Sequence, residues 1–196
     1  MTTSTPYVGP ERAVRAVHAY LTDPVAGINA ALVKRRAAYV AGGVPCTVAN
    51  LPAVALIERW YHATQPNLFP YLSVTESGCD PWGDRPREYL FATPLTLALL
   101  VLESDIAGAM AECDEAMARY AGTLLLMLAR DRWAGSQQDQ PSGLEAWSMA
   151  GYDEGRIRGV DGWSVQTAAR TDPTLGIPNR ALLCDFRVIT YEGPSP

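Results

Sequence analysis

The chain has 196 residues, of which 48% are hydrophobic and 19% are charged, and its 16 basic and 21 acidic side chains give a formal net charge of -5. This composition is typical of a globular protein, and one substantial domain is the default at this length. The acidic balance, with residues 34–36 as the one basic cluster, argues against tight sequence-independent binding to DNA.

Helical spacing dominates the first 66 residues. Apolar residues at helical intervals predict a helix over residues 11–21 and a second over residues 25–40, which ends at two glycines. A third, short helix is predicted over residues 52–62, because proline suits the first helical position and apolar residues follow at helical spacing. We therefore expect a helical N-terminal region over residues 1–66.

An alternating pattern begins at residue 69. Residues 69–77 (FPYLSVTES) predict a strand, which Pro70 limits to a sheet edge or to a strand start. Residues 78–87 (GCDPWGDRPR) are rich in glycine, proline and aspartate and predict a loop. Trp82 stands out in this loop, because an aromatic ring is costly to leave in water; it indicates a contact with a partner or, more commonly, with its own domain.

The middle of the chain predicts a buried strand followed by a long helix. Residues 88–103 are almost continuously apolar from Leu95 onward, which is typical of a strand at the centre of a sheet. From residue 104 or 105 to residue 130, apolar side chains recur at helical intervals, and acidic residues precede basic ones in agreement with the helix dipole. This helix is expected to lie across the sheet.

The last third of the chain predicts a hairpin. A polar loop over residues 135–143 leads to residues 154–170, whose alternation is interrupted by glycines, as in a bent or bulged strand. The final strand covers residues 180–192 (RALLCDFRVITYE) and is expected to run antiparallel to the bulged one. Its mostly apolar face carries Leu182, Cys184, Phe186, Val188 and Thr190.

The other face of the final strand has apolar residues at both ends and two charged residues between them. Such a face packs against something beyond its own core, and two coverings remain open, namely a neighbouring subunit and a helix or loop of the same chain. The candidates for a subunit or partner interface are Trp82, Leu183, Ile189 and Tyr191.

Together these elements predict the α+β class, with a mainly antiparallel sheet of about four or more strands packed by a long helix. The helical region over residues 1–66 would precede a sheet-and-helix core over residues 67–196, and the two are expected to form one domain. The low charge content is typical of a subunit that buries much of its exterior.

No motif for catalysis or for a cofactor is found in the sequence. It contains no glycine-rich phosphate or dinucleotide loop, no zinc-protease helix and no nucleophile elbow. The two histidines, His18 and His62, belong to no catalytic motif, and Glu58 with His62 lacks a third metal ligand. We therefore expect no catalytic, cofactor-binding or metal-binding residues, and no enzymatic activity.

Ordinary structural explanations suit the remaining reactive residues. Carboxylates that could form an acid and base pair lie at Asp80, Asp84 and Glu88 and at Asp153 with Glu154, but isolated loop carboxylates are usually solvated. The four cysteines lie at least 33 positions apart, which excludes a CxxC clamp and predicts buried thiols. No uncharged run reaches the roughly 20 residues of a membrane span, and no signal-peptide pattern opens the chain, so we expect synthesis in the cytoplasm.

The order of elements resembles that of a known family. The strand FPYLSVTES, the strand TPLTLALLVLES running into the helix SDIAGAMAECDEAMARYAGTLL, and the hairpin closing on RALLCDFRVITYE are similar to the tail terminator and tail-completion proteins of tailed bacteriophages. The likeness covers residues 69–192 and includes the terminal aromatic and acidic pair, Tyr191 and Glu192. The helical N-terminal region is longer than in the simplest members of the family.

This resemblance implies a structural virion protein located in the tail or neck. Subunits of the family assemble into a ring, commonly a hexamer, that caps the tail tube and joins it to the head-tail connector or stopper protein. DNA would pass through the ring without sequence-specific binding, and no membrane is involved. Two alternatives remain, namely a head-side neck adaptor, and a small cytoplasmic enzyme or ligand-binding domain that uses the loop over residues 80–87.

Overall fold

The computed structural model describes residues 6–44, 51–60, 68–81, 89–102, 110–128, 141–171 and 178–193. Within these ranges the helices are α1 (Gly9–Thr22), α2 (Ile28–Ala41), α4 (Met110–Leu128) and α5 (Gly143–Met149), with the short 3₁₀ helix η3 (Asp153–Gly155). The strands are β1 (Leu56–Arg59), β2 (Tyr71–Glu76), β3 (Asp80–Pro81), β4 (Leu90–Leu102), β5 (Ile157–Thr171) and β6 (Pro178–Tyr191).

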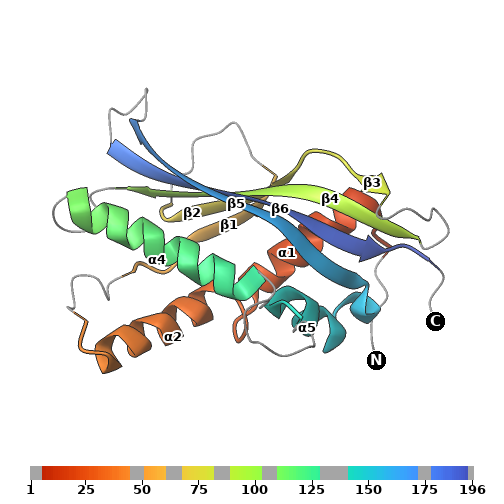
Figure 1. Cartoon of the computed structure of the whole chain (residues 1–196), viewed down its shortest axis with the longest axis horizontal. Helices are drawn as coiled ribbons and strands as arrows, with labels where there is room; N and C mark the ends of the chain where they lie inside the picture. The colour runs from red at the N-terminus through yellow and green to blue at the C-terminus, as the bar shows by residue number, and fades with distance from the viewer. Residues whose placement is uncertain are drawn as a thin grey trace.

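The six described strands form one mixed sheet. Its order is β1-β2-β4-β6-β5, and the short β3 pairs with the first residues of β4. β1 runs parallel to β2, whereas all the other pairings are antiparallel. The predicted α+β class is confirmed, and so is the central position of β4 between β2 and β6 (Figure 1).

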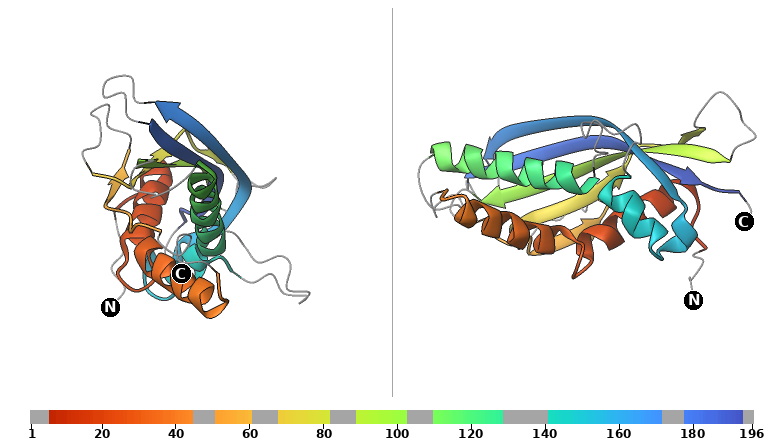
Figure 2. Two further views of the ribbon diagram at one scale, coloured as in Figure 1. Left: turned by 90° about the vertical axis from the view of Figure 1, so that its left-hand side faces the viewer. Right: turned by 60° about the horizontal axis from the view of Figure 1, so that its bottom comes forward.

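The helices lie together on one face of the sheet, as Figures 1 and 2 show. α1 packs beneath β1 and β2, while α4 packs beneath β6 and β5 and against α2. One continuous core joins the two layers, with Val17 from α1, Leu97 from β4, Tyr120 from α4 and Phe186 from β6 among its members. The first helix therefore shares its core with the sheet.

The two faces of β6 are as the alternation predicts. The five residues of its mostly apolar face are all buried against the helices: Leu182, Cys184, Phe186, Val188 and Thr190. β6 pairs along its whole length with β4 and runs antiparallel to β5, as expected for the hairpin. The predicted bend in β5 is also confirmed, because the pairing register shifts twice, once on each side of Val160.

The helix predicted over residues 52–62 is wrong for the part that the structure describes. Residues 51–55 have no regular secondary structure and residues 56–59 form β1, while residues 61 and 62 lie outside the described residues. Tertiary contacts hold this segment open, because Tyr120 Oη donates to the carbonyl of Pro52 and Asn29 bonds both the amide and the carbonyl of Val54. A short helix gains little stability from its own hydrogen bonds. The strand pairing of β1 with β2 is therefore the more favourable structure.

Helix α5 has no counterpart among the predicted elements. α5 begins inside the expected polar loop, where Ser142 and Glu145 form a capping box: each side chain bonds the backbone amide of the other residue. The spacing of a serine and a glutamate three residues later is readable in the sequence. The seven residues of α5, about two turns, are too few to show a clear helical period, so periodicity predicts no helix here.

Candidate functional site

The outer face of the sheet, opposite the helices, carries three of the four predicted interface residues. Alternation along β6 places Leu183, Ile189 and Tyr191 on this face, whereas Trp82 lies outside the described residues. None of the described helices crosses the outer face (Figure 2). The N-terminal helices cover the other face of the sheet. They are therefore not the covering of the outer face of β6 that the sequence left open.

Leu183 belongs to a small apolar patch on this outer face. It lies opposite Ala98 of β4 in the antiparallel register, and Leu100 is the next outward-facing residue of β4. All three side chains are partly exposed. We refer to Ala98, Leu100 and Leu183 as the outer apolar patch. Its position on β4 and β6, inside the sheet, suits contact with another apolar surface.

Ile189 contributes little to the exposed surface, because only 9% of it is accessible. Gly159 of β5 is the cross-strand partner of Ile189, and a Cβ atom at residue 159 would lie 2.9 Å from Ile189 Cδ1. The absence of a side chain at Gly159 lets Ile189 pack closely against the backbone of β5. Ile189 is therefore buried within the packing of the sheet, against its own neighbouring strand.

Tyr191 lies in an aromatic group at the far end of the outer face. Its ring meets that of Tyr89 edge-on, with 6.5 Å between the centroids. The guanidinium of Arg158 lies 5.6 Å from the centroid of the Tyr191 ring. Tyr89 is 53% exposed, so this group combines Tyr and Arg side chains with accessible surface, a composition that recurs at protein interfaces.

Polar contacts separate these two apolar groups. Thr96 Oγ1 donates to Asp185 Oδ1 at 2.6 Å across β4 and β6, and Arg187 bonds Asp161 of β5 at 2.9 Å. Both pairs are cross-strand neighbours. Each pair therefore stabilises the register of its two strands and gives a charged side chain a partner.

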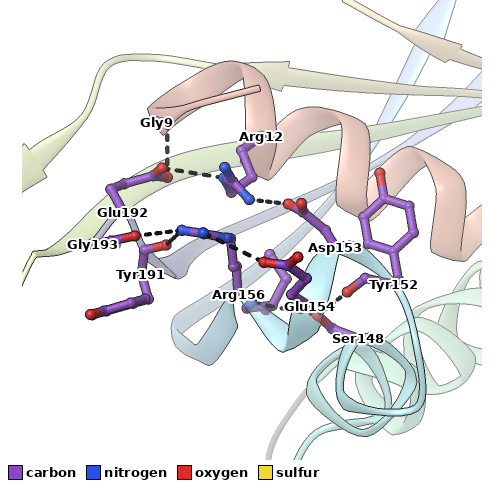
Figure 3. A network of polar contacts seen from close by, with 11 residues as sticks. Gly9, Arg12, Ser148, Tyr152, Asp153, Glu154, Arg156, Tyr191, Glu192 and Gly193 are labelled. Atoms are coloured by element: carbon purple, nitrogen blue, oxygen red, sulfur yellow. Dashed lines mark hydrogen bonds and ion pairs between the residues drawn. The ribbon is translucent and has the colours of Figure 1, made fainter. Parts of the chain in front are cut away.

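A buried polar network joins the same end of the sheet to α1 (Figure 3). The guanidinium of Arg12 pairs with the carboxylate of Asp153 and lies 3.3 Å from Glu192 Oε2, while Glu192 Oε1 accepts from the amide of Gly9 at 2.9 Å. The side chains of Arg12 and Asp153 are 4% and 0% exposed. Three segments that are distant in the sequence are therefore tied together by buried charge.

Arg156 extends this network to the end of β6. It donates to the carbonyls of Tyr191 and Gly193, at 3.3 Å and 2.8 Å, and lies 3.6 Å from Glu154. The residues before it adopt left-handed backbone conformations, with φ of 49° at Asp153 and 55° at Glu154. Such conformations are costly for non-glycine residues and require surrounding contacts to hold them.

The ion pairs of this network stabilise the fold. Asp153 and Glu154, a carboxylate pair considered from the sequence for acid and base work, face different cations, and Asp153 is fully enclosed.

Of the other carboxylates considered, Asp80 is exposed on β3, while Asp84 and Glu88 lie outside the described residues. Glu58 accepts from Tyr71 Oη at 3.0 Å. Within the described ranges, no group of three metal-ligating side chains is brought together.

The described cysteines are free thiols. Cys113 and Cys184 are buried, as the sequence predicts, whereas Cys79 is half-buried beside Thr93. Burial raises the pKa of the Cys184 thiol to about 12, and the neighbouring carboxylate of Asp185 adds to the effect. A thiol in this state is a poor nucleophile.

Comparison with known proteins adds no family assignment. No family model matches the chain, and no curated protein sequence matches it. Among the described residues, no helix is both long enough and apolar enough to cross a membrane.

Proposed function

We propose that this protein is a structural subunit of a bacteriophage tail terminator or neck ring, located in the virion. The observation that carries the proposal is the outer apolar patch, which is partly exposed at the centre of the sheet while the described helices lie on the opposite face. A second copy of the chain is the proposed occupant of this face. The likeness of residues 69–192 to tail terminator proteins supports the same assignment.

The shape of the subunit also supports a ring. The two long edges of the sheet differ, because β1 with α1 borders one side and β5 with α4 borders the other (Figure 2). Contacts between unlike surfaces generate closed rings when the rotation between neighbours closes. In the proposed assembly the ring, commonly a hexamer in the resembled family, caps the tail tube and contacts the connector or stopper protein. DNA passes through its centre.

Solution mass and electron microscopy test the proposal. The purified chain is measured by light scattering over a range of concentrations, alone and with assembled tail tubes, and both samples are imaged by negative stain. We expect rings of one diameter, free or bound at one end of each tube. A monomer that forms no ring under either condition would contradict the proposal. Rings that bind isolated portal-containing heads but not tubes would identify the head-side adaptor.

A further inference from the structure

Two arginines and two aromatic rings gather where α1 passes the end of β1. Arg15 belongs to α1, Arg59 ends β1, Trp60 follows it, and Tyr7 precedes α1. The guanidinium of Arg15 lies 4.2 Å from the centroid of the Tyr7 ring and 5.7 Å from that of Trp60. The guanidinium of Arg59 also lies 5.7 Å from the Trp60 centroid, so both cations border the same indole.

The backbone at Trp60 is held in an unusual conformation. Its φ of 60° lies in the left-handed region, which bulky side chains rarely adopt. The amide of Trp60 donates to the carbonyl of Val74 at 2.7 Å, which fixes the backbone at the end of β1. Strained residues of this kind are concentrated at binding and switch sites.

The cluster presents several hydrogen-bond donors. Glu11 accepts from Nε of Arg15 at 2.8 Å. The side chain of Arg59 and the indole N–H of Trp60 form no ion pair or hydrogen bond with a described residue. Arg15, Arg59 and Trp60 are all partly exposed, so a ligand can reach them.

The pKa of His18, on α1, depends on its burial and on the positive charges of the cluster. Its Nε2 lies 3.1 Å from the carbonyl of Ile57 and therefore acts as the donor. Burial lowers the pKa of His18 most, and the positive charges of Arg59 and Arg15 lower it further, while the bond to Ile57 opposes them. A bound anion would offset the two arginine charges.

We infer that Arg15, Arg59 and Trp60 form a binding site for a phosphate group beside the β1 edge of the sheet. The guanidinium fork binds phosphate oxygens through paired N–H donors, and two positive charges beside one indole match a dianionic phosphate better than a carboxylate with a single charge. The cluster lies with α1 on the helix-bearing side of the sheet, away from the outer apolar patch.

Nuclear magnetic resonance of the full chain tests this inference, with inorganic phosphate as the probe at constant ionic strength. The His18 ring signals are assigned with a His18→Gln variant. Phosphate is expected to shift them saturably and to raise the pKa of His18, because the bound anion adds negative charge near the imidazole. A short single-stranded oligonucleotide, titrated in parallel, distinguishes free phosphate from a nucleic-acid backbone, according to which of the two binds more tightly.

Matched variants locate the site. Arg59→Gln should weaken phosphate binding by about tenfold or more, whereas Lys34→Gln, which removes the same charge from exposed α2, should leave it unchanged. Trp60→Phe keeps a ring and removes the indole N–H, and its weaker binding provides the test if Arg59→Gln does not fold. The inference is overturned by shifts that do not saturate with either probe, by equal weakening in Lys34→Gln, or by acetate binding as tightly as phosphate.

Discussion

The guanidinium of Arg12 is paired with the carboxylate of Asp153, a residue 141 positions away in the chain, and both side chains are almost completely enclosed. Glu192 approaches the same guanidinium from the end of β6. Arg12 is thus the cation between two carboxylates from different parts of the chain. Because water is excluded, the loss of this cation leaves buried negative charge behind.

Replacing Arg12 with methionine should therefore destabilise the fold strongly. We expect Arg12→Met to lower the free energy of unfolding by about 3–5 kcal/mol, measured by urea denaturation. The control is Arg187→Met, which removes an exposed pair with Asp161 and should cost less than about 1 kcal/mol. Similar losses in the two variants would show that the Arg12 network contributes no more than a surface ion pair.

The outer face gives a prediction that separates assembly from folding. Leu183→Asp places a charge on the partly exposed outer apolar patch and should reduce the mass of the assembly in solution while the unfolding midpoint stays close to that of the native chain. Ile189→Asp places a charge at a buried position, against Gly159 of β5, and should instead destabilise the monomer by several kcal/mol. If Leu183→Asp assembles normally, the outer apolar patch is not the subunit contact.

Acid should loosen the turn between α1 and α2 through Asp23. Its carboxylate accepts from the amides of Ala26 and Val25, both at 2.8 Å, and from the indole N–H of Trp147 at 3.1 Å. These bonds, with Ala26 the largest contributor, hold the pKa of Asp23 below its ordinary value. A depressed folded pKa contributes stability above the unfolded pKa, and this contribution is lost as pH falls through the folded pKa.

The expected result is a steeper acid loss of stability in the native chain than in Asp23→Asn. The asparagine keeps an oxygen acceptor and does not titrate, so the two curves of unfolding free energy against pH should diverge below about pH 4. Asp80→Asn, at an exposed position, is the control and should follow the native curve. Parallel curves for Asp23→Asn and the native chain would contradict the role given to Asp23.

Thiol reactivity should divide the cysteines by burial. With a pKa of about 12, Cys184 has about one thiolate in ten thousand molecules at pH 8, and the helices cover it. Iodoacetamide should label half-buried Cys79 in the native protein and Cys184 only after denaturation, as read by peptide mass spectrometry. Labelling of native Cys184 as fast as Cys79 would show that β6 opens readily.

Most of the sheet could be predicted because its strands are long and their two faces differ. Alternation in β6 identified five of the buried residues of its inner face, and the glycines of β5 indicated its bulges. β1 could not be predicted in this way, because four residues are too few to show a period and their strand conformation depends on β2.

The buried network could not be predicted for a different reason. Arg12, Asp153 and Glu192 form no motif in the sequence, and only the completed fold brings them together. Likewise, Ile189 and Leu183 have the same outward position in the alternation, yet their exposure differs because Ile189 packs closely against its cross-strand partner Gly159. Such differences in exposure depend on how closely neighbouring strands approach each other in the folded chain. The periodicity of the sequence does not show this.

The order of strands has a consequence for biosynthesis. β5 is bonded to the sheet through β6, which is made after it, and β6 in turn is flanked by β4, which is made much earlier. During translation, β5 therefore emerges from the ribosome with no partner and must wait for β6 to complete the sheet. Until β6 has paired, one edge of β4 is open, so chaperone binding should matter most before β6 is in place.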